Sequence, residues 1–255
     1  MTFETIRLER DSGLARLTFD RPRVLNAGNA RWVAEFGEAV RQLTAASDLR
    51  VVVVTGAGRG FSTGVDLDAL AAGEMRLEHF VAWEEAMTAL ERLDAIVIAG
   101  INGHCLGGGL QIALVCDYRL VADEALLGLP AVKECLVPSM ALYRLPRLIG
   151  LARAQELILT GRSLSAREAE QCGLVHRVVP TGQFDDALGE VVQHFLALPP
   201  TSTRVSKRLL GRAHELDFAS FRREMEAGLR ECLASDDHRA AMAVIRDRRR
   251  PALPR

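Results

Sequence analysis

Residues 60–67 read GFSTGVDL and residues 104–111 read HCLGGGLQ, and each stretch carries glycines at a turn that follows an apolar run. Glycine has no Cβ, so backbone N–H groups at such turns can approach a ligand closely. Two turns of this kind, brought together, can hold one oxygen atom between two amides, an arrangement called an oxyanion hole. The pair therefore predicts a site for an acyl group that becomes an enolate or a tetrahedral adduct.

The apolar runs around these turns predict an α/β fold with a helical C-terminal part. The four valines at 51–54 and the apolar run at 95–99 are typical of strands that are covered on both faces of a sheet. Helical patterns dominate after Pro130, where we expect one further strand at 174–179. Because strands and helices alternate early and helices cluster late, the order indicates an α/β core followed by helices.

The composition is that of an ordinary soluble globular protein of 255 residues, with 49% apolar and 25% charged residues. The net charge of −1 provides no overall field that would attract nucleic acid or a membrane. The basic run at 246–250 is the local exception. It is interpreted either as a solvated tail or as a contact for a phosphate group.

The cysteines and the N-terminus indicate where the protein works. The five cysteines include no C-x-x-C pair, which is typical of reduced thiols in the cytosol. No apolar stretch approaches the length of a membrane span, and the first residues lack the layout of a signal peptide. We therefore expect a cytoplasmic protein with no membrane or nucleic-acid partner.

Two familiar motifs overlap the first glycine turn, and neither fits well. Residues 56–60 suggest a dinucleotide-binding loop, but the third glycine of that fingerprint would fall at Phe61. Residues 60–64 match the G-x-S-x-G elbow of serine hydrolases, which requires the serine on a sharp turn directly after a strand. The predicted strand ends well before Ser62, and no histidine is an obvious partner for that serine.

Six stretches in order along the chain match the pattern of one enzyme family. They are RPRVLNA (21–27), VVVVTGAG (51–58), FSTGVDL (61–67), INGHCLGGG (101–109), LTGRSLSAREA (159–169) and GLV (173–175). Through these stretches, the chain resembles the crotonase (enoyl-CoA hydratase/isomerase) family. The resemblance runs almost from end to end, and the motifs are highly specific as a set.

The resemblance implies a crotonase-like ββα spiral core over residues 1–195 and a helical trimerisation region over residues 196–255. It implies a homotrimer or homohexamer that binds an acyl-CoA thioester. Coenzyme A would enter as part of the substrate, with no permanently bound cofactor and no metal. The thioester oxygen would lie between the backbone N–H groups of Val65 and Gly108, and Asp66 would cap a helix.

The resemblance also implies five contacts with CoA. Arg23, Val24 and Leu25 correspond to the strip that lines CoA near its adenosine and phosphates. Lys207 stands in a helix where family members usually carry a lysine. Arg248 corresponds to a basic residue that, in the family, reaches a CoA phosphate from a neighbouring subunit.

The departures from the family pattern concern the acid–base residues. Family hydratases use two glutamates, and the corresponding positions here hold Gln111 and Ala131. Neither side chain accepts a proton, and general acid–base help is worth roughly 10²–10⁴ in rate, so we expect poor hydration. Ser139 stands where some isomerases and dehalogenases carry an aspartate. Glu134, one turn beyond Ala131, is either a replacement base or a surface carboxylate.

Isomerase- or decarboxylase-type chemistry is therefore expected in place of normal hydration. Decarboxylation of a malonyl-type thioester needs no base, because the loss of CO₂ itself forms the enolate. Double-bond isomerisation needs a base, for which Glu134 is the candidate. Two other classes remain open: an acyl-CoA-binding protein without catalysis, and a serine hydrolase that uses Ser62.

Overall fold

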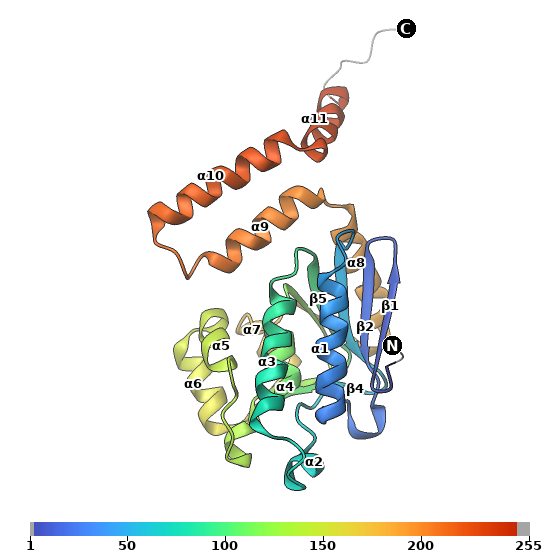
Figure 1. Ribbon diagram of the computed structural model, residues 1–255, viewed down its shortest axis with the longest axis vertical. Helices are drawn as coiled ribbons and strands as arrows, with labels where there is room; N and C mark the ends of the chain where they lie inside the picture. The colour runs from blue at the N-terminus through green and yellow to red at the C-terminus, as the bar shows by residue number, and fades with distance from the viewer. Residues whose placement is uncertain (1–2, 249–255) are drawn as a thin grey trace. The chain divides into compact units, whose positions relative to one another are not determined.

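The computed structural model describes residues 3–248, apart from the side chains of the last two. The chain forms two compact units, one ending at Gln193 and the other beginning at His194 (Figure 1). Both predicted glycine turns belong to the first unit. Within the described residues, no helix combines the length and the apolar character that crossing a bilayer requires.

The first unit is built around a six-stranded sheet with the order β1-β2-β3-β5-β7-β10. Its strands are β1 (Ile6–Asp11), β2 (Leu14–Phe19), β3 (Val51–Gly56), β5 (Ile96–Ile101), β7 (Tyr118–Ala122) and β10 (Arg177–Val179). β1 pairs with β2 in antiparallel fashion, and the other neighbours pair in parallel. The four valines at 51–54 are fully buried in β3, as the sequence predicted for a strand covered on both faces.

A second, smaller sheet has the order β4-β6-β8-β9. Its strands are β4 (Gly60–Ser62), β6 (His104–Leu106), β8 (Leu126–Gly128) and β9 (Ser163–Ser165). β4, β6 and β8 follow β3, β5 and β7 along the chain, so each of these strands of the large sheet is continued by a short strand of the small one. This repeat agrees with the predicted ββα spiral.

Helices complete both units. Those that lie in the first unit or cross into the second are α1 (Ala30–Thr44), α2 (Leu67–Ala71), α3 (Leu77–Glu91), α4 (Gly108–Leu114), α5 (Ala141–Ile149), α6 (Leu151–Thr160), α7 (Ala166–Gln171) and α8 (Phe184–Ala197), with 3₁₀ helices η1 (Pro22–Val24), η2 (Pro130–Glu134) and η3 (Thr181–Gln183). The second unit continues with α9 (Pro200–Arg212), α10 (Phe218–Ala234) and α11 (Asp236–Arg248). The predicted dominance of helices after Pro130 is confirmed.

Helix α1 illustrates how the local sequence positions these elements. Its N-cap is Asn29, whose side chain accepts a hydrogen bond from the Trp32 backbone N–H. The apolar residues that recur at helical spacing, from Trp32 to Leu43, are buried on one face. α1 runs beside α3, which carries part of the candidate site (Figure 1).

One predicted strand begins later than expected. The structure has β10 only at Arg177–Val179, so the prediction of a strand from Leu174 was wrong at its start. The backbone N–H groups of Leu174 and Val175 donate to the carbonyl of Ala169 and close the end of α7. Their apolar side chains are buried there, and burial alone does not distinguish a strand from a helix end.

Candidate active site

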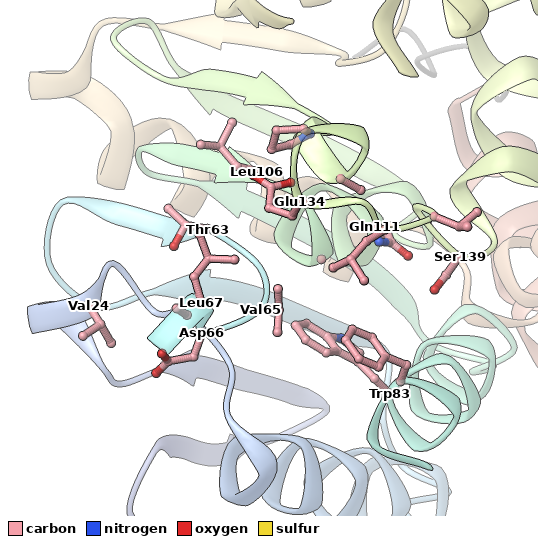
Figure 2. Close-up of a pocket in the computed structure, with 18 of the residues that line it drawn as sticks. Val24, Thr63, Val65, Asp66, Leu67, Trp83, Leu106, Gln111, Glu134 and Ser139 are labelled. Carbon is pink, nitrogen blue, oxygen red and sulfur yellow. The ribbon is translucent and has the colours of Figure 1, made fainter. Parts of the chain in front are cut away.

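A cavity of about 420 Å³ opens where the two glycine turns meet. Five parts of the first unit line it: residues 24–27, residues 63–68, one face of α3, residues 106–111 and residues 130–139 (Figure 2). The cavity thus has one wall from the glycine turns and another from the segment that begins with η2.

The backbones of the two turns touch at Gly64 and Gly108. A Cβ placed on Gly64, whose φ is +90°, would lie 2.6 Å from the backbone nitrogen of Gly108. Likewise, a Cβ on Gly108 would lie 3.4 Å from the Gly64 Cα. This close approach requires glycine at position 64, as the turn pattern in the sequence predicted.

Hydrogen bonds to Gly28 set the direction of the Val65 amide. The Gly28 N–H donates to the Gly64 carbonyl at 2.7 Å, and the Asp66 N–H donates to the Gly28 carbonyl at 3.0 Å. In this parallel bridge between Gly28 and Val65, the N–H of Val65 points away from Gly28. Val65 and Gly108 both line the cavity, and the N–H of Gly108, the first residue of α4, has no acceptor inside that helix.

Ser62 holds the first turn together from below. Its side chain is fully buried, its hydroxyl donates to the Asn26 carbonyl at 2.9 Å, and it accepts from the Gly64 N–H at 3.2 Å. The Asn26 side-chain amide in turn donates to the Gly60 carbonyl. A nucleophilic serine needs an accessible hydroxyl, which the buried Ser62 lacks. The serine at this position of the hydrolase motif is explained by its hydrogen bonds within the turn.

Asp66 caps α2, as expected from the sequence. Its carboxylate accepts from the Ala69 backbone N–H and pairs with the Arg21 guanidinium at 2.9 Å. Burial by itself would raise the pKa of the Asp66 carboxyl, but the hydrogen bonds from Arg21 and Ala69 outweigh it and lower that pKa. The carboxylate therefore stays ionised and paired with Arg21.

The structure brings the four predicted acid–base positions to one cavity. Gln111, Ala131, Glu134 and Ser139 all line it. Glu134 is half-buried, and no other described residue forms a hydrogen bond or ion pair with its carboxylate. Gln111 extends between the two walls, and its side-chain oxygen is buried without a partner (Figure 2). The charged residues of the lining are all acidic, Asp66 and Asp68 together with Glu134.

The residues expected to contact CoA are placed less uniformly. Val24 lines the cavity, whereas its neighbours Arg23, which is exposed, and Leu25, with φ +51°, lie outside the lining. Lys207 lies on α9 in the second unit. Arg248 ends α11, and its side chain is outside the described part of the chain. Contact of these residues with CoA stays a prediction.

Sequence reasoning missed the side chains that α3 contributes. Trp83 is 4% exposed, and its ring edge would lie 2.6 Å from a Cβ on Gly108. Phe80 and Met87 line the cavity from the same helix. Their spacing of three and four residues identifies one helical face, but it does not identify the glycine turn as the surface that this face covers.

Comparisons with known proteins identify the family that the chain matches in sequence and in fold. Residues 9–253 match the family model described as enoyl-CoA hydratase/isomerase. The chain is 33% identical over 259 residues to a probable enoyl-CoA hydratase of Mycobacterium bovis, covering 98% of each protein. The fold matches an enoyl-CoA hydratase structure from Bacillus anthracis with a TM-score of 0.90, at 30% identity and 98% coverage of both chains. A putative enoyl-CoA hydratase from Thermobifida fusca in complex with CoA matches with a TM-score of 0.82 at 34% identity, over 90% of this chain and 93% of that one.

Proposed function

The chain belongs to the enoyl-CoA hydratase/isomerase family, and from this premise we propose that it stabilises the enolate of an acyl-CoA thioester between the N–H groups of Val65 and Gly108. The observation that carries the proposal is the contact of the two glycine turns at the edge of one cavity. Fixed backbone donors stabilise negative charge without reorganising as it develops, and removing one such donor costs roughly 10²–10³ in rate.

We propose that the protein is a poor hydratase, although several relatives are named enoyl-CoA hydratases. Hydration of an enoyl group requires a base for the attacking water and an acid for the α-carbon. The Gln111 side chain can orient a water but exchanges no proton, and the Ala131 side chain has no polar atom. The loss of general acid–base help removes roughly 10²–10⁴ of the rate.

Double-bond isomerisation is the reaction that the lining favours. Glu134 has a carboxylate that faces no competing partner among the described residues, so it can take a proton from the acyl chain and return it to another carbon. The electron pair of the broken C–H bond moves to the thioester oxygen, where the two amides stabilise it. Decarboxylation is favoured less, because the acidic lining repels a substrate that carries a free carboxylate.

Restoring the missing pair tests the reason for poor hydration. We expect the double variant Gln111→Glu with Ala131→Glu to raise hydration of crotonyl-CoA above the wild-type rate by roughly 10²–10⁴. Loss of the enoyl absorbance measures the rate, and the two single variants serve as controls. Unchanged kinetics in a folded double variant would contradict the assignment of these two positions.

Replacing Glu134 tests the isomerase assignment itself. Glu134→Gln keeps the shape of the side chain and removes the base, so we expect isomerisation of a 3-enoyl-CoA to fall by roughly 10²–10⁴ while binding persists. Wild-type protein that binds 3-enoyl-, crotonyl- and malonyl-CoA without converting any of them would support the non-catalytic alternative. Covalent labelling of Ser62 by a fluorophosphonate would support the hydrolase alternative.

We also propose assembly into a homotrimer or homohexamer through residues 196–255. On α10, Met225, Leu229 and Leu233 recur every four residues and are 38%, 53% and 54% exposed. Residues at this spacing share one face of a helix, and an exposed apolar face favours contact with another chain. Light scattering after gel filtration gives the mass directly, and a monomer at micromolar concentration would contradict the proposal.

A further inference from the structure

A partly buried ionic cluster joins α5 to α3. Arg144 of α5 is 8% exposed, and its Nη1 lies 2.8 Å from the Glu84 carboxylate of α3. Its Nη2 lies 2.9 Å from the carboxylate of Glu91, two turns further along the same helix. The Thr88 hydroxyl, between the two acids, donates to Glu84 at 3.2 Å. One guanidinium thus bridges two carboxylates of a single helix.

The cluster is formed by residues that lie close in sequence to two cavity-lining segments. Glu84 follows Trp83, whose ring covers Gly108 and lines the cavity. Arg144 comes five residues after Ser139, the last lining residue of the opposite wall. Helices α3 and α5 are distant in the sequence, and the cluster is a direct polar link between them.

The cavity-lining segment just before α5 has an unusual backbone. Cys135 and Ser139 have φ values of +56° and +38°, in the left-handed region that residues with a Cβ rarely adopt. Such conformations persist where the surrounding structure over-determines them. Leu136 and Val137, between these two positions, contribute side chains to the cavity.

Buried ion pairs add little net stability compared with apolar packing, but breaking one leaves an uncompensated buried charge. Burial alone would lower the pKa of Arg144, whereas the hydrogen bonds and charges of Glu91 and Glu84 outweigh it and raise that pKa, so the guanidinium stays protonated. The cluster therefore acts as a permanent, directional link rather than as a source of stability.

We propose that Arg144 is a positioning residue that, through Glu84 and Glu91, fixes residues 135–139 against Trp83 and thereby sets the fit of the acyl group. The proposal rests on the proposed function, because it requires that this cavity holds the acyl part of an acyl-CoA. It assigns a role in specificity to residues that touch no substrate. The expected consequence is selective: the acyl group should lose its fit, whereas CoA itself should not.

The experiment compares the affinities for butyryl-CoA and for free CoA, measured by calorimetry on the full-length protein. The dissociation constant of CoA divided by that of butyryl-CoA reports the contribution of the acyl group alone, and this ratio falls when the acyl group loses its fit. We expect Arg144→Met to reduce this ratio on the order of tenfold, because groups displaced by about 1 Å lose their fit to the bound ligand. Arg144→Lys keeps the charge without the planar fork that reaches both carboxylates, so we expect a partial loss.

Arg147→Met is the matched control. Arg147 lies on the same helix, is exposed, and stacks over the Tyr143 ring at 3.3 Å instead of joining the cluster. We expect it to keep the wild-type ratio. Because Arg144→Met removes a buried cation and can prevent folding, Glu91→Gln is tested beside it. The Glu91 side chain is 41% exposed, so its loss is tolerated more easily, and we expect a ratio a few-fold below the wild-type value.

The outcomes separate the two proposals. If wild-type protein binds butyryl-CoA no more tightly than CoA, the acyl-binding function is wrong and the inference loses its premise. If the wild type discriminates but folded Arg144→Lys and Glu91→Gln keep the full ratio, the positioning role of Arg144 is overturned while the proposed function stands. An equal loss of affinity for CoA and butyryl-CoA would likewise overturn it, since that indicates general structural damage.

Discussion

The two walls of the cavity are built in different ways. The wall from residues 63–68 and 106–109 is shaped by two backbones in close contact, whereas the wall from residues 130–139 contains no glycine. In the first wall the close approach of two chains requires glycine, since a Cβ on Gly109 would lie 2.1 Å from the Ser62 carbonyl oxygen. In the second wall, positions such as Ala131 and Ser139 accept other side chains of similar size without moving the backbone.

This difference separates two parts of catalysis. Backbone amides would stabilise the same negative charge on any thioester, so we expect the first wall to suit many acyl groups. The choice of reaction then depends on which side chain of the second wall exchanges a proton, and here Glu134 is the candidate. The comparison predicts that changes in the first wall abolish function together with structure, whereas changes in the second wall redirect the chemistry.

The largest effect is expected from Gly64→Ala in the backbone wall. The new Cβ combines a left-handed φ of +90° with a distance of 2.6 Å to the Gly108 nitrogen. We expect the free energy of unfolding to fall by about 3–5 kcal/mol, measured by chemical denaturation. Gly73→Ala is the matched control, because Gly73 has a similar φ of +74° but no atom within 4 Å of its Cβ position.

Gly73→Ala should cost only about 1 kcal/mol, the strain of the left-handed backbone. The difference between the two variants then measures the steric contact of the turns alone. Equal losses for Gly64→Ala and Gly73→Ala would mean that the two turns do not approach as closely as described, and the contrast between the walls would disappear.

The next effect concerns the hydrogen-bond donor at Gly108. Proline is compatible with the first position of a helix and has no N–H, so Gly108→Pro deletes one proposed oxyanion donor. We expect kcat/KM for a 3-enoyl-CoA to fall by roughly 10²–10³. Gly108→Ala adds a Cβ that meets the same Trp83 ring but keeps the N–H. If Gly108→Ala loses as much activity as Gly108→Pro, the ring contact and not the donor is responsible.

The backbone wall is also the part of the site that the sequence predicts best. Glycine at positions 64, 108 and 109 is a consequence of steric crowding, and glycine at 107 of a positive φ, so the turns can be recognised by their glycines without coordinates. The same is true of Asp66, because a helix cap is a local interaction within three residues. The cap depends on neighbours along the chain, and the glycines mark the turns by their residue type.

The parts that the sequence does not predict depend on contacts between distant segments. An apolar helix face predicts that Trp83 is buried, but not that its ring covers Gly108. Arg144 and Glu91 are 53 residues apart, and Glu84 alone suggests only a solvated helix face. Long-range pairing of this kind leaves no periodic signal in a single sequence.

A smaller effect is expected from Ser62→Ala, which removes a support beneath the backbone wall. The lost hydroxyl leaves the Asn26 carbonyl and the Gly64 N–H without their partner. We expect the free energy of unfolding to fall by about 1–2 kcal/mol in chemical denaturation, and turnover of an acyl-CoA to persist. Complete loss of turnover in a folded Ser62→Ala protein would instead point to a nucleophilic serine.

The smallest effect concerns His176, which supports the far end of α4. The Arg119 guanidinium donates hydrogen bonds to the carbonyls of Ala113 and Cys116 at that end of the helix. The backbone N–H of Arg119 donates to His176 Nδ1 at 3.1 Å. Burial, followed by the charge of Arg119, lowers the pKa of His176 to about 4. The folded state therefore holds the imidazole in its neutral form.

The unfolded chain binds the proton first, near the usual pKa of about 6.5, so the contribution of His176 is complete above that pH and is lost as the pH falls toward 4. Because the ring is partly exposed, we expect a contribution of about 1 kcal/mol rather than the full shift. His176→Asn keeps a side-chain acceptor for the Arg119 N–H without titrating in this range. Chemical denaturation near pH 7 and pH 5 should therefore show a smaller loss of stability in the variant than in the wild type. An identical loss in both proteins would mean that His176 binds its proton equally well before and after unfolding, and that acid weakens the backbone wall through another group.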